Sequence, residues 1–377
     1  MLFLFYVFLE QFEIRKNLTM NHYYQEKGRI IAQLKNRTKP KIVVSKNNRL
    51  IIFILLVITW GTAHAQDAEF SQYYANPLYL NPAYAGATEC GRLGLNYRNQ
   101  YPSLSNAYVT YNISYDQSMP GINSGFGFLV MNDVQGDGGL TRTSVAAYYA
   151  YELKVTSDIN IRFGAKAAYY QEKLSWDKFI FASQIDPTTG NIDPDSGEEP
   201  PPKDNITAVD FAAGLLMNYS DKFFVGFAAD HLTQPNLSFY NDDNSKLPMK
   251  ITVNAGLSIN ASNGGLGNAY GDDIIIQPNV LYMQQENFHQ LSAGLYVTKY
   301  PFVIGSWFRH NFQNPDAIVA LIGITYNSIR VGYSYDFTVS QVGGKAGGAH
   351  EISFAWDFCL YKEASRRHIK AIKSPSF

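Results

Sequence analysis

Apolar and polar residues alternate through long runs of this sequence. Similar runs begin near residues 159, 251, 329 and 352. Because successive side chains of a β-strand point to opposite faces, a period of two predicts strands with one apolar and one polar face. The sequence therefore favours an all-β fold. In one run, Ile329, Val331, Tyr333, Tyr335 and Phe337 alternate with Arg330, Gly332, Ser334, Asp336 and Thr338.

The length of these runs separates a membrane barrel from a soluble β-sandwich. They cover about 10 to 13 residues, whereas most soluble strands have about 5 or 6 residues. About 10 residues cross a bilayer when the strand is tilted. The 27 tyrosines and 24 phenylalanines suit the aromatic girdles of such a barrel. We therefore predict a transmembrane antiparallel β-barrel of outer-membrane type.

The strands and their connections also predict an orientation. We expect fourteen strands, an even number, as bacterial outer-membrane barrels have. If both ends of the mature chain are periplasmic, the long connections 173–206, 232–248 and 338–349 face outward. Most periplasmic connections are then short, and 261–272 is the exception. The expected strands are 92–98, 106–116, 122–132, 140–153, 159–172, 207–218, 222–231, 249–260, 273–284, 289–299, 302–310, 316–326, 328–337 and 350–361.

The first 65 residues have the pattern of a secretory signal peptide. Basic residues up to Arg49 precede the apolar run 50–61, and Ala63-His64-Ala65 forms a small-x-small cleavage site. The apolar run is shorter than the roughly 20 residues that a membrane anchor needs, which is the competing interpretation. We expect cleavage after Ala65. The predicted parts are a presequence 1–65, a periplasmic or plug segment 66–91, a barrel 92–361 and a basic periplasmic tail 362–377.

Removal of the presequence leaves an acidic protein. The chain has 31 Lys and Arg against 32 Asp and Glu, and residues 1–65 hold 10 and 3 of these. The mature chain therefore carries 21 against 29, a net charge of −8. This argues against a nucleic-acid partner, which needs a basic face. We expect a solvated tail, with contact to anionic lipid or an acidic partner as the alternative; its basic residues are Lys362, Arg366, Arg367, Lys370 and Lys373.

No motif in the sequence points to catalysis. A G-x-S-x-G elbow, an H-E-x-x-H helix, a Walker loop and a Cys/His metal cluster are absent. The adjacent pair His350-Glu351 permits acid–base chemistry, but a histidine at the barrel rim is the better interpretation. The acidic stretch 186–199 offers oxygen ligands for calcium, yet its spacing matches no EF-hand, so a solvated loop is preferred. We expect no enzyme activity, no cofactor and no metal site.

The charged residues of the strands point inward by their position in the alternation. They suit a conducting channel or a plugged lumen in which they pair, and the sequence does not decide between the two. The inward set is Arg98, Arg142, Glu152, Arg162, Lys166, Asp210, Asp230, Arg309, Arg330, Asp336, Glu351 and Asp357.

Two cysteines lie at the two ends of the predicted barrel. Cys90 precedes the first strand and Cys359 lies near the end of the last strand. These strands are neighbours in a closed barrel, and their ends are expected in the periplasm, which is oxidising. We predict a Cys90–Cys359 disulfide that seals the barrel. Two free thiols at different heights are the alternative, because Cα atoms more than about 7 Å apart cannot be bridged.

Residues 71–87, SQYYANPLYLNPAYAGA, stand apart from the alternating runs. Pro77 and Pro82 argue against a regular helix and against a central strand. The tyrosines need burial. We expect the segment to fold into the lumen or across its periplasmic mouth as a plug, with asparagine side chains capping the backbone groups that the prolines leave free. An exposed arm that binds a partner is the alternative.

Several motifs of the mature chain resemble the PorP/SprF family of the type IX secretion system. FSQYYANPLYLNPAYAGA at 70–87 resembles its opening signature, and GGAHEISFAWDF at 347–358 resembles its last strand, with Ala349 as a departure from the usual serine. ISYDQ at 113–117, the ND pair at 132–133 followed by Gly136, and VGYSYDF at 331–337 continue the likeness. The signature residues are Tyr73, Tyr74, Asn76, Pro77, Tyr79, Asn81, Pro82 and Tyr84, together with Asp336, His350 and Glu351.

The resemblance implies an outer-membrane barrel of Bacteroidota type that serves protein secretion and gliding motility. Its expected partners are outer-membrane lipid and either components of the periplasmic ring, as for PorP, or one secreted cargo with a C-terminal sorting domain, as for SprF. We favour a cargo-specific helper, because the sequence contains no periplasmic domain that would hold a large ring. A passive porin for small solutes is the alternative function.

Overall fold

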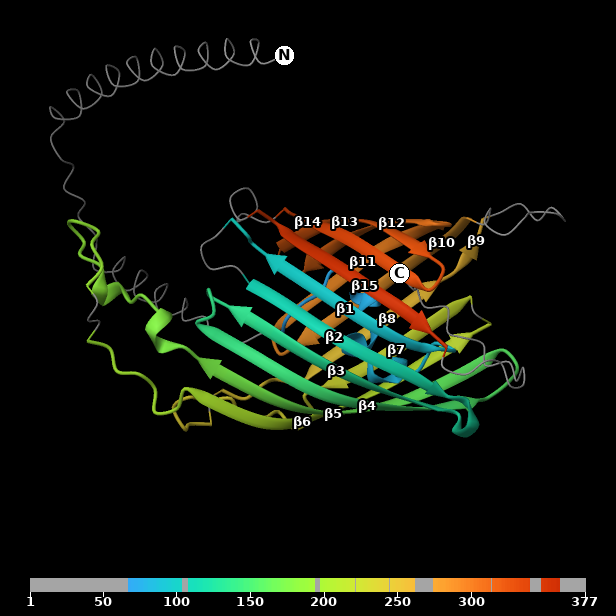
Figure 1. Cartoon of the computed structure of the whole chain (residues 1–377), viewed down its shortest axis with the longest axis horizontal. Helices are drawn as coiled ribbons and strands as arrows, with labels where there is room; N and C mark the ends of the chain where they lie inside the picture. Colours follow the sequence, from blue (N-terminus) through green and yellow to red (C-terminus); the bar gives the residue numbers. More distant parts are fainter. Residues whose placement is uncertain are drawn as a thin grey trace, which may run out of the picture. The chain divides into compact units, whose positions relative to one another are not determined.

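The strands of this computed structural model form one antiparallel sheet that closes on itself (Figure 1). The structure describes residues 67–359 except 104–107, 194–196, 221, 244, 262–273, 313 and 340–346, so the presequence, the basic tail and most of connection 261–272 lie outside the described residues. The strands are β1 Gly91–Gln100, β2 Tyr108–Met119, β3 Ser124–Gln135, β4 Leu140–Lys154, β5 Ile159–Leu174, β6 Asn205–Tyr219, β7 Phe223–Asp230, β8 Lys250–Leu257, β9 Ile259–Asn260, β10 Ile274–Gln285, β11 Phe288–Lys299, β12 Phe302–Asn311, β13 Asn314–Tyr326, β14 Ile329–Thr338 and β15 Ala349–Phe358.

The barrel has fourteen strands, as the sequence predicts. The two residues of β9 continue β8 along the same neighbour, β10, and the two together count as one strand. Each further strand pairs with the next one in the chain, and β15 returns to pair with β1. A closed barrel leaves no sheet edge, so every backbone group in the wall finds its partner without water. No helix among the described residues is long and apolar enough to cross a membrane.

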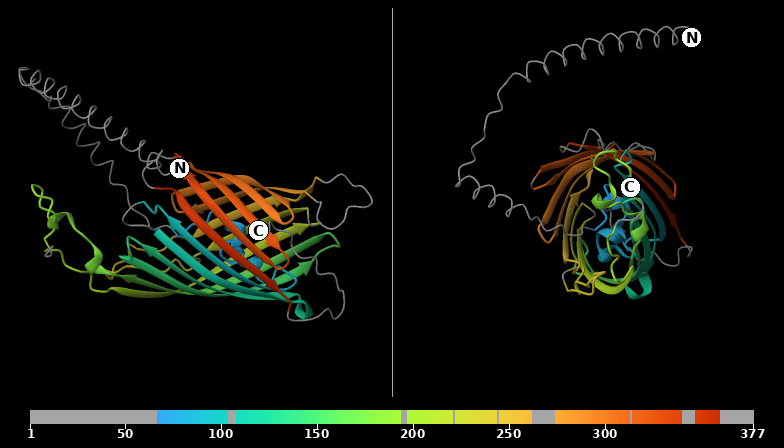
Figure 2. Two further views of the ribbon diagram at one scale, coloured as in Figure 1. Left: turned by 45° about the horizontal axis from the view of Figure 1, so that its top comes forward. Right: turned by 90° about the vertical axis from the view of Figure 1, so that its left-hand side faces the viewer.

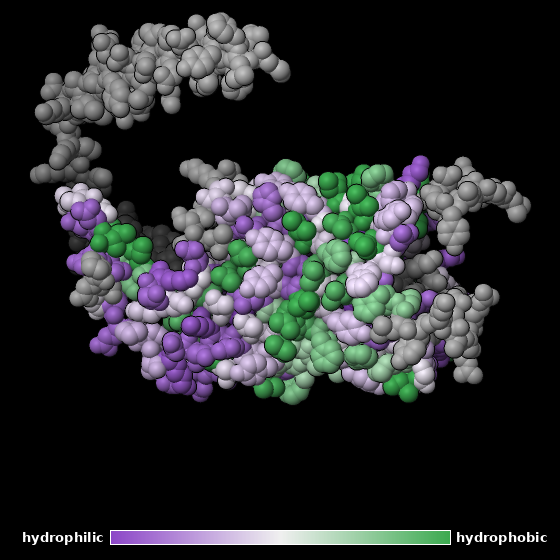
Figure 3. Space-filling view, viewed as in Figure 1, coloured by the Kyte–Doolittle hydropathy of each residue, from purple (hydrophilic) through white to green (hydrophobic). Residues whose placement is uncertain are grey.

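The two faces of the wall differ as the alternation predicts. On β14, Ile329, Val331 and Phe337 are 43%, 45% and 52% exposed on the outside, while Ser334 and Asp336 are buried inside. The same division holds along the other strands, with apolar side chains outward. Figure 3 shows hydrophobic side chains gathered over the middle of the wall and hydrophilic ones at the end that carries the loop 175–204. An apolar outer band is what a lipid bilayer requires.

The two ends of the barrel carry connections of different length. Loops 175–204 and 231–249 lie at one end, which we call the long-loop mouth. Tight connections such as 155–158 and 327–328 lie at the other end, the short-turn mouth. The long and short connections therefore lie at opposite ends of the barrel, as the sequence predicts.

A disulfide between Cys90 and Cys359 closes the barrel at the short-turn mouth, as predicted. The antiparallel register of β1 and β15 ends at the pair Gly91–Phe358, so the two cysteines come directly after it. Their Cα atoms are 4.6 Å apart, a separation that a disulfide spans. The bond therefore joins the first and last strands covalently.

Residues 67–88 fold inside the barrel, and we call them the plug (Figure 2, right). The plug contains only short helical turns: η1 Tyr73–Ala75, α3 Pro77–Leu80 and η2 Pro82–Tyr84. The prolines begin α3 and η2, where a missing N–H costs nothing. Asn81 caps η2 by accepting a hydrogen bond from the Ala83 N–H at 2.8 Å, as predicted, but the Asn76 side chain caps nothing. The alternative of an exposed arm is therefore wrong.

The plug crosses the whole barrel, which corrects one expectation. Asp67 contacts Lys250 and His231 at the long-loop mouth, whereas Gly86 contacts the short-turn end of β3 at Gly125. The plug was expected to begin at the periplasmic mouth, on the same side as Cys359. Asp67 and Cys359 instead lie at opposite mouths, because the plug must cross the lumen before β1 begins. The first and last described residues therefore do not share one mouth of the barrel.

Replacing both cysteines by alanine (C90A/C359A) is expected to weaken the barrel without opening it. The hydrogen-bonded register of β1 and β15 remains, and the cost is about 2–4 kcal/mol in the free energy of unfolding. Urea unfolding in detergent, followed by tryptophan fluorescence, measures the change. Reduced wild-type protein is the matched control and should unfold like the variant. Equal unfolding midpoints for oxidised and reduced wild type would contradict the expectation.

Candidate functional site: a plug held inside the barrel

The plug is as buried as the core of a soluble protein. Phe70 to Ala87 are all buried except Tyr79, which is half-buried. The plug residues form two apolar clusters with inward side chains of the wall. The lumen of the described barrel is therefore filled by protein rather than left as an open channel.

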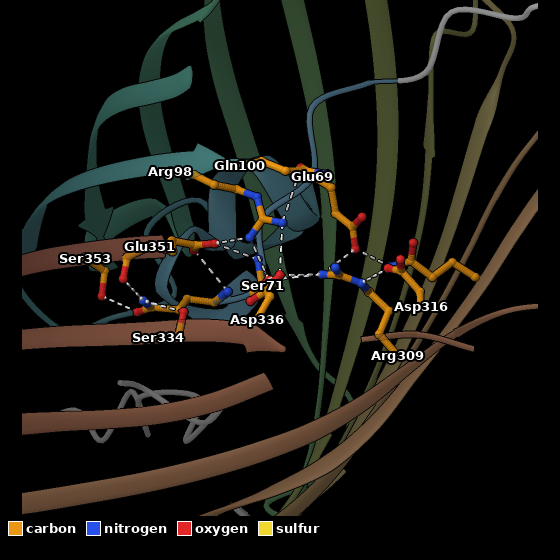
Figure 4. Close-up of polar contacts among 12 residues, drawn as sticks. Glu69, Ser71, Arg98, Gln100, Arg309, Asp316, Ser334, Asp336, Glu351 and Ser353 are labelled. Carbon is orange, nitrogen blue, oxygen red and sulfur yellow. Dashed lines mark hydrogen bonds and ion pairs between the residues drawn. The ribbon is translucent and has the colours of Figure 1, made fainter. Parts of the chain in front are cut away.

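Three buried charged side chains fix the plug near the long-loop mouth (Figure 4). Arg98 of β1 donates to Glu351 of β15 at 3.1 Å and to Asp336 of β14 at 3.0 Å. Glu351 accepts the backbone N–H groups of Ser71 at 2.7 Å and Gln72 at 3.0 Å. The Ser71 hydroxyl donates to Asp336 at 2.6 Å. One carboxylate thus holds two consecutive main-chain groups of the plug and an arginine of the wall.

A second arginine extends this cluster across the lumen. Arg309 of β12 lies 3.1 Å from Asp336 and 3.3 Å from Glu69 of the plug, and it also pairs with Asp316 of β13. Arg309 is only 5% exposed. Charges buried to this extent are stable only when they are paired and hydrogen-bonded. The plug and the five strands β1, β12, β13, β14 and β15 therefore stabilise one another.

Gln72 completes the contacts of the plug with β14 and β15. Its side-chain amide donates to the Ser334 hydroxyl at 3.0 Å and to the Glu351 backbone carbonyl at 2.9 Å. Its carbonyl accepts from the Ser353 hydroxyl at 2.6 Å. Figure 4 shows these serines on the neighbouring strands, with their hydroxyls directed to the plug. The polar side chains on the inner face of β14 and β15 are therefore hydrogen-bond partners of the plug.

Asp67 is held by three basic side chains at the long-loop mouth. Its carboxylate lies 2.7 Å from Lys250, 2.8 Å from His231 and 3.5 Å from Arg142. Burial opposes ionisation, but the charges of His231 and Lys250 outweigh it, so the pKa of Asp67 is held well below its usual range. Burial also opposes protonation of His231, yet Asp67 and a hydrogen bond to Asp210 raise its pKa. Both shifts favour the charged pair.

The tyrosines of the plug pack on an apolar strip of the inner wall. Tyr73 stacks edge-on against Trp307 at 6.2 Å, and Tyr74 lies 5.8 Å from Phe224 and 6.3 Å from Tyr296. The Tyr73 hydroxyl and the Trp307 indole N–H both donate to Asn279. Tyr73 and Trp307 therefore find both apolar contact and a polar partner, which buried tyrosine and tryptophan need.

The Asn81-Pro82 turn lies against glycines of the wall. A Cβ atom added to Gly164 of β5 would come within 2.2 Å of the Ala83 backbone nitrogen. One added to Gly214 of β6 would come within 2.1 Å of the Asn81 side chain. The Asn81 amide nitrogen donates at 3.1 Å to the backbone carbonyls of Leu215 and Phe227. Glycine is required here because the two backbones approach too closely for a side chain.

A third set of buried charges holds the end of the plug near the short-turn mouth. Arg162 of β5 donates to the backbone carbonyls of Ala83 at 3.1 Å and Ala85 at 2.6 Å, and it pairs with Glu152 at 2.7 Å. Asp116 of β2 accepts the Gly86 N–H at 3.0 Å. The plug is thus fixed at both ends and in the middle.

The inward charges of the wall are paired, so the plugged-lumen interpretation is confirmed over the conducting channel. All twelve residues of the inward set take part in ion pairs, and Asp210 does so with His231. The other pairs are Arg98 with Asp336 and Glu351, Arg142 with Asp67 and Glu172, Arg162 with Glu152, Lys166 with Asp230, Arg309 with Asp316 and Asp336, and Arg330 with Asp357.

The structure brings most of the signature residues together. All eight from the first signature lie in the plug: Tyr73, Tyr74, Asn76, Pro77, Tyr79, Asn81, Pro82 and Tyr84. Asp336 and Glu351 of the second signature hold the plug, but His350 does not. Adjacent residues of a strand face opposite sides, so His350 lies outside the lumen, where its ring contacts the Tyr333 hydroxyl at 2.8 Å. An acid–base pair of His350 and Glu351 is therefore wrong.

The sequence does not identify the partners of these residues. Arg98, Arg162 and Arg309 carry a recognisable signal, since each is a charge on the inward face, but no pattern connects them to the plug. Asp67 and Ser71 carry no such signal, because they precede any strand and their contacts arise only when the lumen forms around them.

The sequence matches the family described as type IX secretion system membrane protein PorP/SprF over residues 62–356. The chain belongs to this family. The match spans the plug and nearly the whole barrel, so it covers both signatures. Together with the barrel fold, it identifies an outer-membrane protein of the type IX secretion system. No curated protein matches the sequence.

Solved structures with a similar fold are outer-membrane proteins of distant sequence. The toluene transporter TbuX of Ralstonia pickettii is 11% identical with a TM-score of 0.43, covering 79% of this chain and 96% of its own. A FadL homologue of Pseudomonas aeruginosa is 14% identical with a TM-score of 0.38, covering 74% of this chain and 93% of its own. At these scores neither structure bears on the function of this member of the PorP/SprF family.

Changing Gly164 to alanine (G164A) is expected to displace the plug and open the barrel. The new methyl group meets the plug backbone, which cannot move aside as a flexible side chain would. Conductance of single barrels in planar bilayers measures the change, and we expect open events that wild type lacks. Gly121→Ala is the matched control, because a Cβ there meets nothing within 4 Å. A closed G164A barrel would contradict this expectation.

Raising the pH is expected to loosen the first residues of the plug. The raised pKa of His231 means that its charge stabilises the plug fully below about pH 6.5, the ordinary histidine value. This contribution is lost as the pH rises through the raised pKa. The contribution of Asp67, whose pKa is lowered, is present above about pH 3.9 and is lost only as the pH falls through that lowered value.

Hydrogen–deuterium exchange of residues 67–72 at pH 6 and pH 9, corrected for the intrinsic rate, measures this effect. His231→Gln should remove the extra loss of protection at pH 9. His289→Gln should keep it, because His289 lies on the outer face beside Tyr282. An unchanged pH dependence in the His231 variant would show that other groups control this end of the plug.

Proposed function

We propose that this protein is a non-enzymatic accessory barrel of type IX secretion that helps export one cargo protein or attach it at the cell surface. The single observation that carries the proposal is the plug, which fills the lumen and is fixed by buried ion pairs. A passive porin needs a water-filled lumen. A closed barrel of a secretion family is better suited to binding protein at its mouths than to passing small solutes.

The long-loop mouth supports a role in protein binding. In loop 175–204, the rings of Trp176 and Phe181 are in contact with centroids 4.8 Å apart, and Phe179 lies beside both. Ile180 and Ile192 of the same loop are 59% and 55% exposed. Exposed apolar side chains beyond the barrel wall are typical of protein-interaction sites. We propose that the cargo binds at this mouth, which faces the cell surface in the orientation given by the loop lengths.

Deletion of the gene, followed by mass spectrometry of surface and medium proteins, tests the proposal. We expect loss of one large protein that ends in a C-terminal sorting domain, with the other secreted proteins unchanged. Wild-type protein supplied on a plasmid should restore this cargo. The variant Ile180→Ser/Ile192→Ser should restore it poorly, and Gly121→Ala should restore it fully.

The other outcomes separate the alternatives. Loss of every protein with a sorting domain would indicate a component that works with the periplasmic ring, as proposed for PorP-like members. An unchanged set of secreted proteins would contradict the secretion role and favour a porin.

A further inference from the structure

The plug contacts the wall without joining its hydrogen-bond ladder. Among the described residues, the backbone–backbone hydrogen bonds of the plug close within the plug itself, for example from Ala75 to Gln72 and from Tyr84 to Asn81. Each strand of the barrel pairs only with neighbouring strands. The plug can therefore leave the lumen without separating any pair of strands.

The wall recognises the main chain of the plug with three charged side chains. Glu351 accepts the N–H groups of Ser71 and Gln72. Arg162 donates to two plug carbonyls, and Asp116 accepts the N–H of Gly86. All three wall residues are at least 94% buried. Main-chain groups are the same in every peptide, so these contacts select a peptide in the right conformation rather than one particular sequence.

The shape of the lumen adds a preference for certain side chains. Trp307, Tyr296 and Phe224 form a surface for two adjacent aromatic rings. The glycines at 164 and 214 leave room only for a tight turn, which Asn81-Pro82 provides. A peptide that fits must therefore present an aromatic pair followed by an Asn-Pro turn.

The middle of the plug is not fully satisfied by the wall. Both polar atoms of the Asn76 side chain are buried without a hydrogen-bond partner in the wall. Asn76 also lines a cavity of about 60 Å³, together with Tyr79 and Leu281. Buried polar groups without partners destabilise the state that contains them. The wall therefore holds the middle of the plug by fewer polar contacts than its two ends.

From these contacts we propose that the lumen is an exchangeable peptide-binding site, and that the plug is its resident ligand. The second ligand is a peptide segment of a partner protein. This segment contains an aromatic pair followed by an Asn-Pro turn. It replaces the plug and takes over the main-chain bonds to Glu351, Arg162 and Asp116. This inference adds a ligand class to the proposed function, but its test uses purified protein and can fail independently of the secretion assay.

An exchange assay on the full chain tests the proposal. A site for a specific protease is inserted between Thr88 and the exposed Glu89, so that cutting turns the plug into a non-covalent ligand while Cys90 stays bonded to the barrel. A fluorescent synthetic peptide with the sequence of residues 67–88 is then added. We expect saturable binding by fluorescence anisotropy and release of the cut plug, detected by mass spectrometry.

Modified peptides show whether the main chain is recognised. N-methylation at Ser71 and Gln72 removes the donors to Glu351 and should weaken binding about tenfold or more. N-methylation at Thr88, which lies beyond these contacts, is the matched control and should change little. A peptide of the same composition in scrambled order should also bind at least tenfold more weakly, because it lacks the Asn-Pro turn at the glycines.

Three results would overturn the proposal. The first is a cut plug that stays in place while no labelled peptide enters, which would make the plug a permanent part of the structure. The second is failure of the peptide to bind a barrel that lacks residues 67–88, when heat-modifiable migration in gels shows that this barrel is folded. The third is equal binding of the scrambled peptide, which would indicate adventitious apolar binding. If the barrel without residues 67–88 does not fold, the exchange assay on the cut full chain tests the proposal by itself.

Discussion

The buried carboxylate of Glu351 is the group on which the arrangement of this protein depends. It lies inside a barrel whose outer face is apolar, and burial of an unpaired charge is prohibitive. Arg98 and two N–H groups of the plug supply its partners. Without the plug, Glu351 lacks two of its hydrogen-bond donors. Without Glu351, the N–H groups of Ser71 and Gln72 lack their acceptor. This mutual dependence explains why a segment before the first strand and the last strand both carry signature residues.

The membrane imposes the complementary constraint on the outer face. Lipid cannot hydrogen-bond to the backbone, so the sheet must close, and the register of β1 with β15 provides that closure. Most apolar residues of the strands then point to lipid, and the lumen receives the charged residues together with the apolar strip that packs on the plug. A lumen with this many charges needs water or a protein ligand. In this protein the plug is the ligand, and the Cys90–Cys359 bond fixes its last residues to the closed wall.

The course of the plug links the two mouths of the barrel. Its first described residue, Asp67, lies among Lys250, His231 and Arg142 beside the long loops, and its last residues lie at the short-turn mouth. A protein that binds the long loops is therefore close to the start of the plug. This proximity gives a secretion partner a physical route to the lumen, which a plug confined to the short-turn mouth would not offer.

The sequence by itself determined the barrel, its fourteen strands, the inward charges and the cysteine pair. These features follow from local alternation and from the rule that first and last strands of a closed barrel are neighbours. Only the tertiary structure decided where the plug begins and which charges hold it. Asp67 and Ser71 are far in the chain from their wall partners Lys250 and Arg309, and these contacts depend on the position of the plug along the lumen. No local pattern encodes that position, because it results from the fit of the Asn81-Pro82 turn to Gly164 and Gly214 on distant strands.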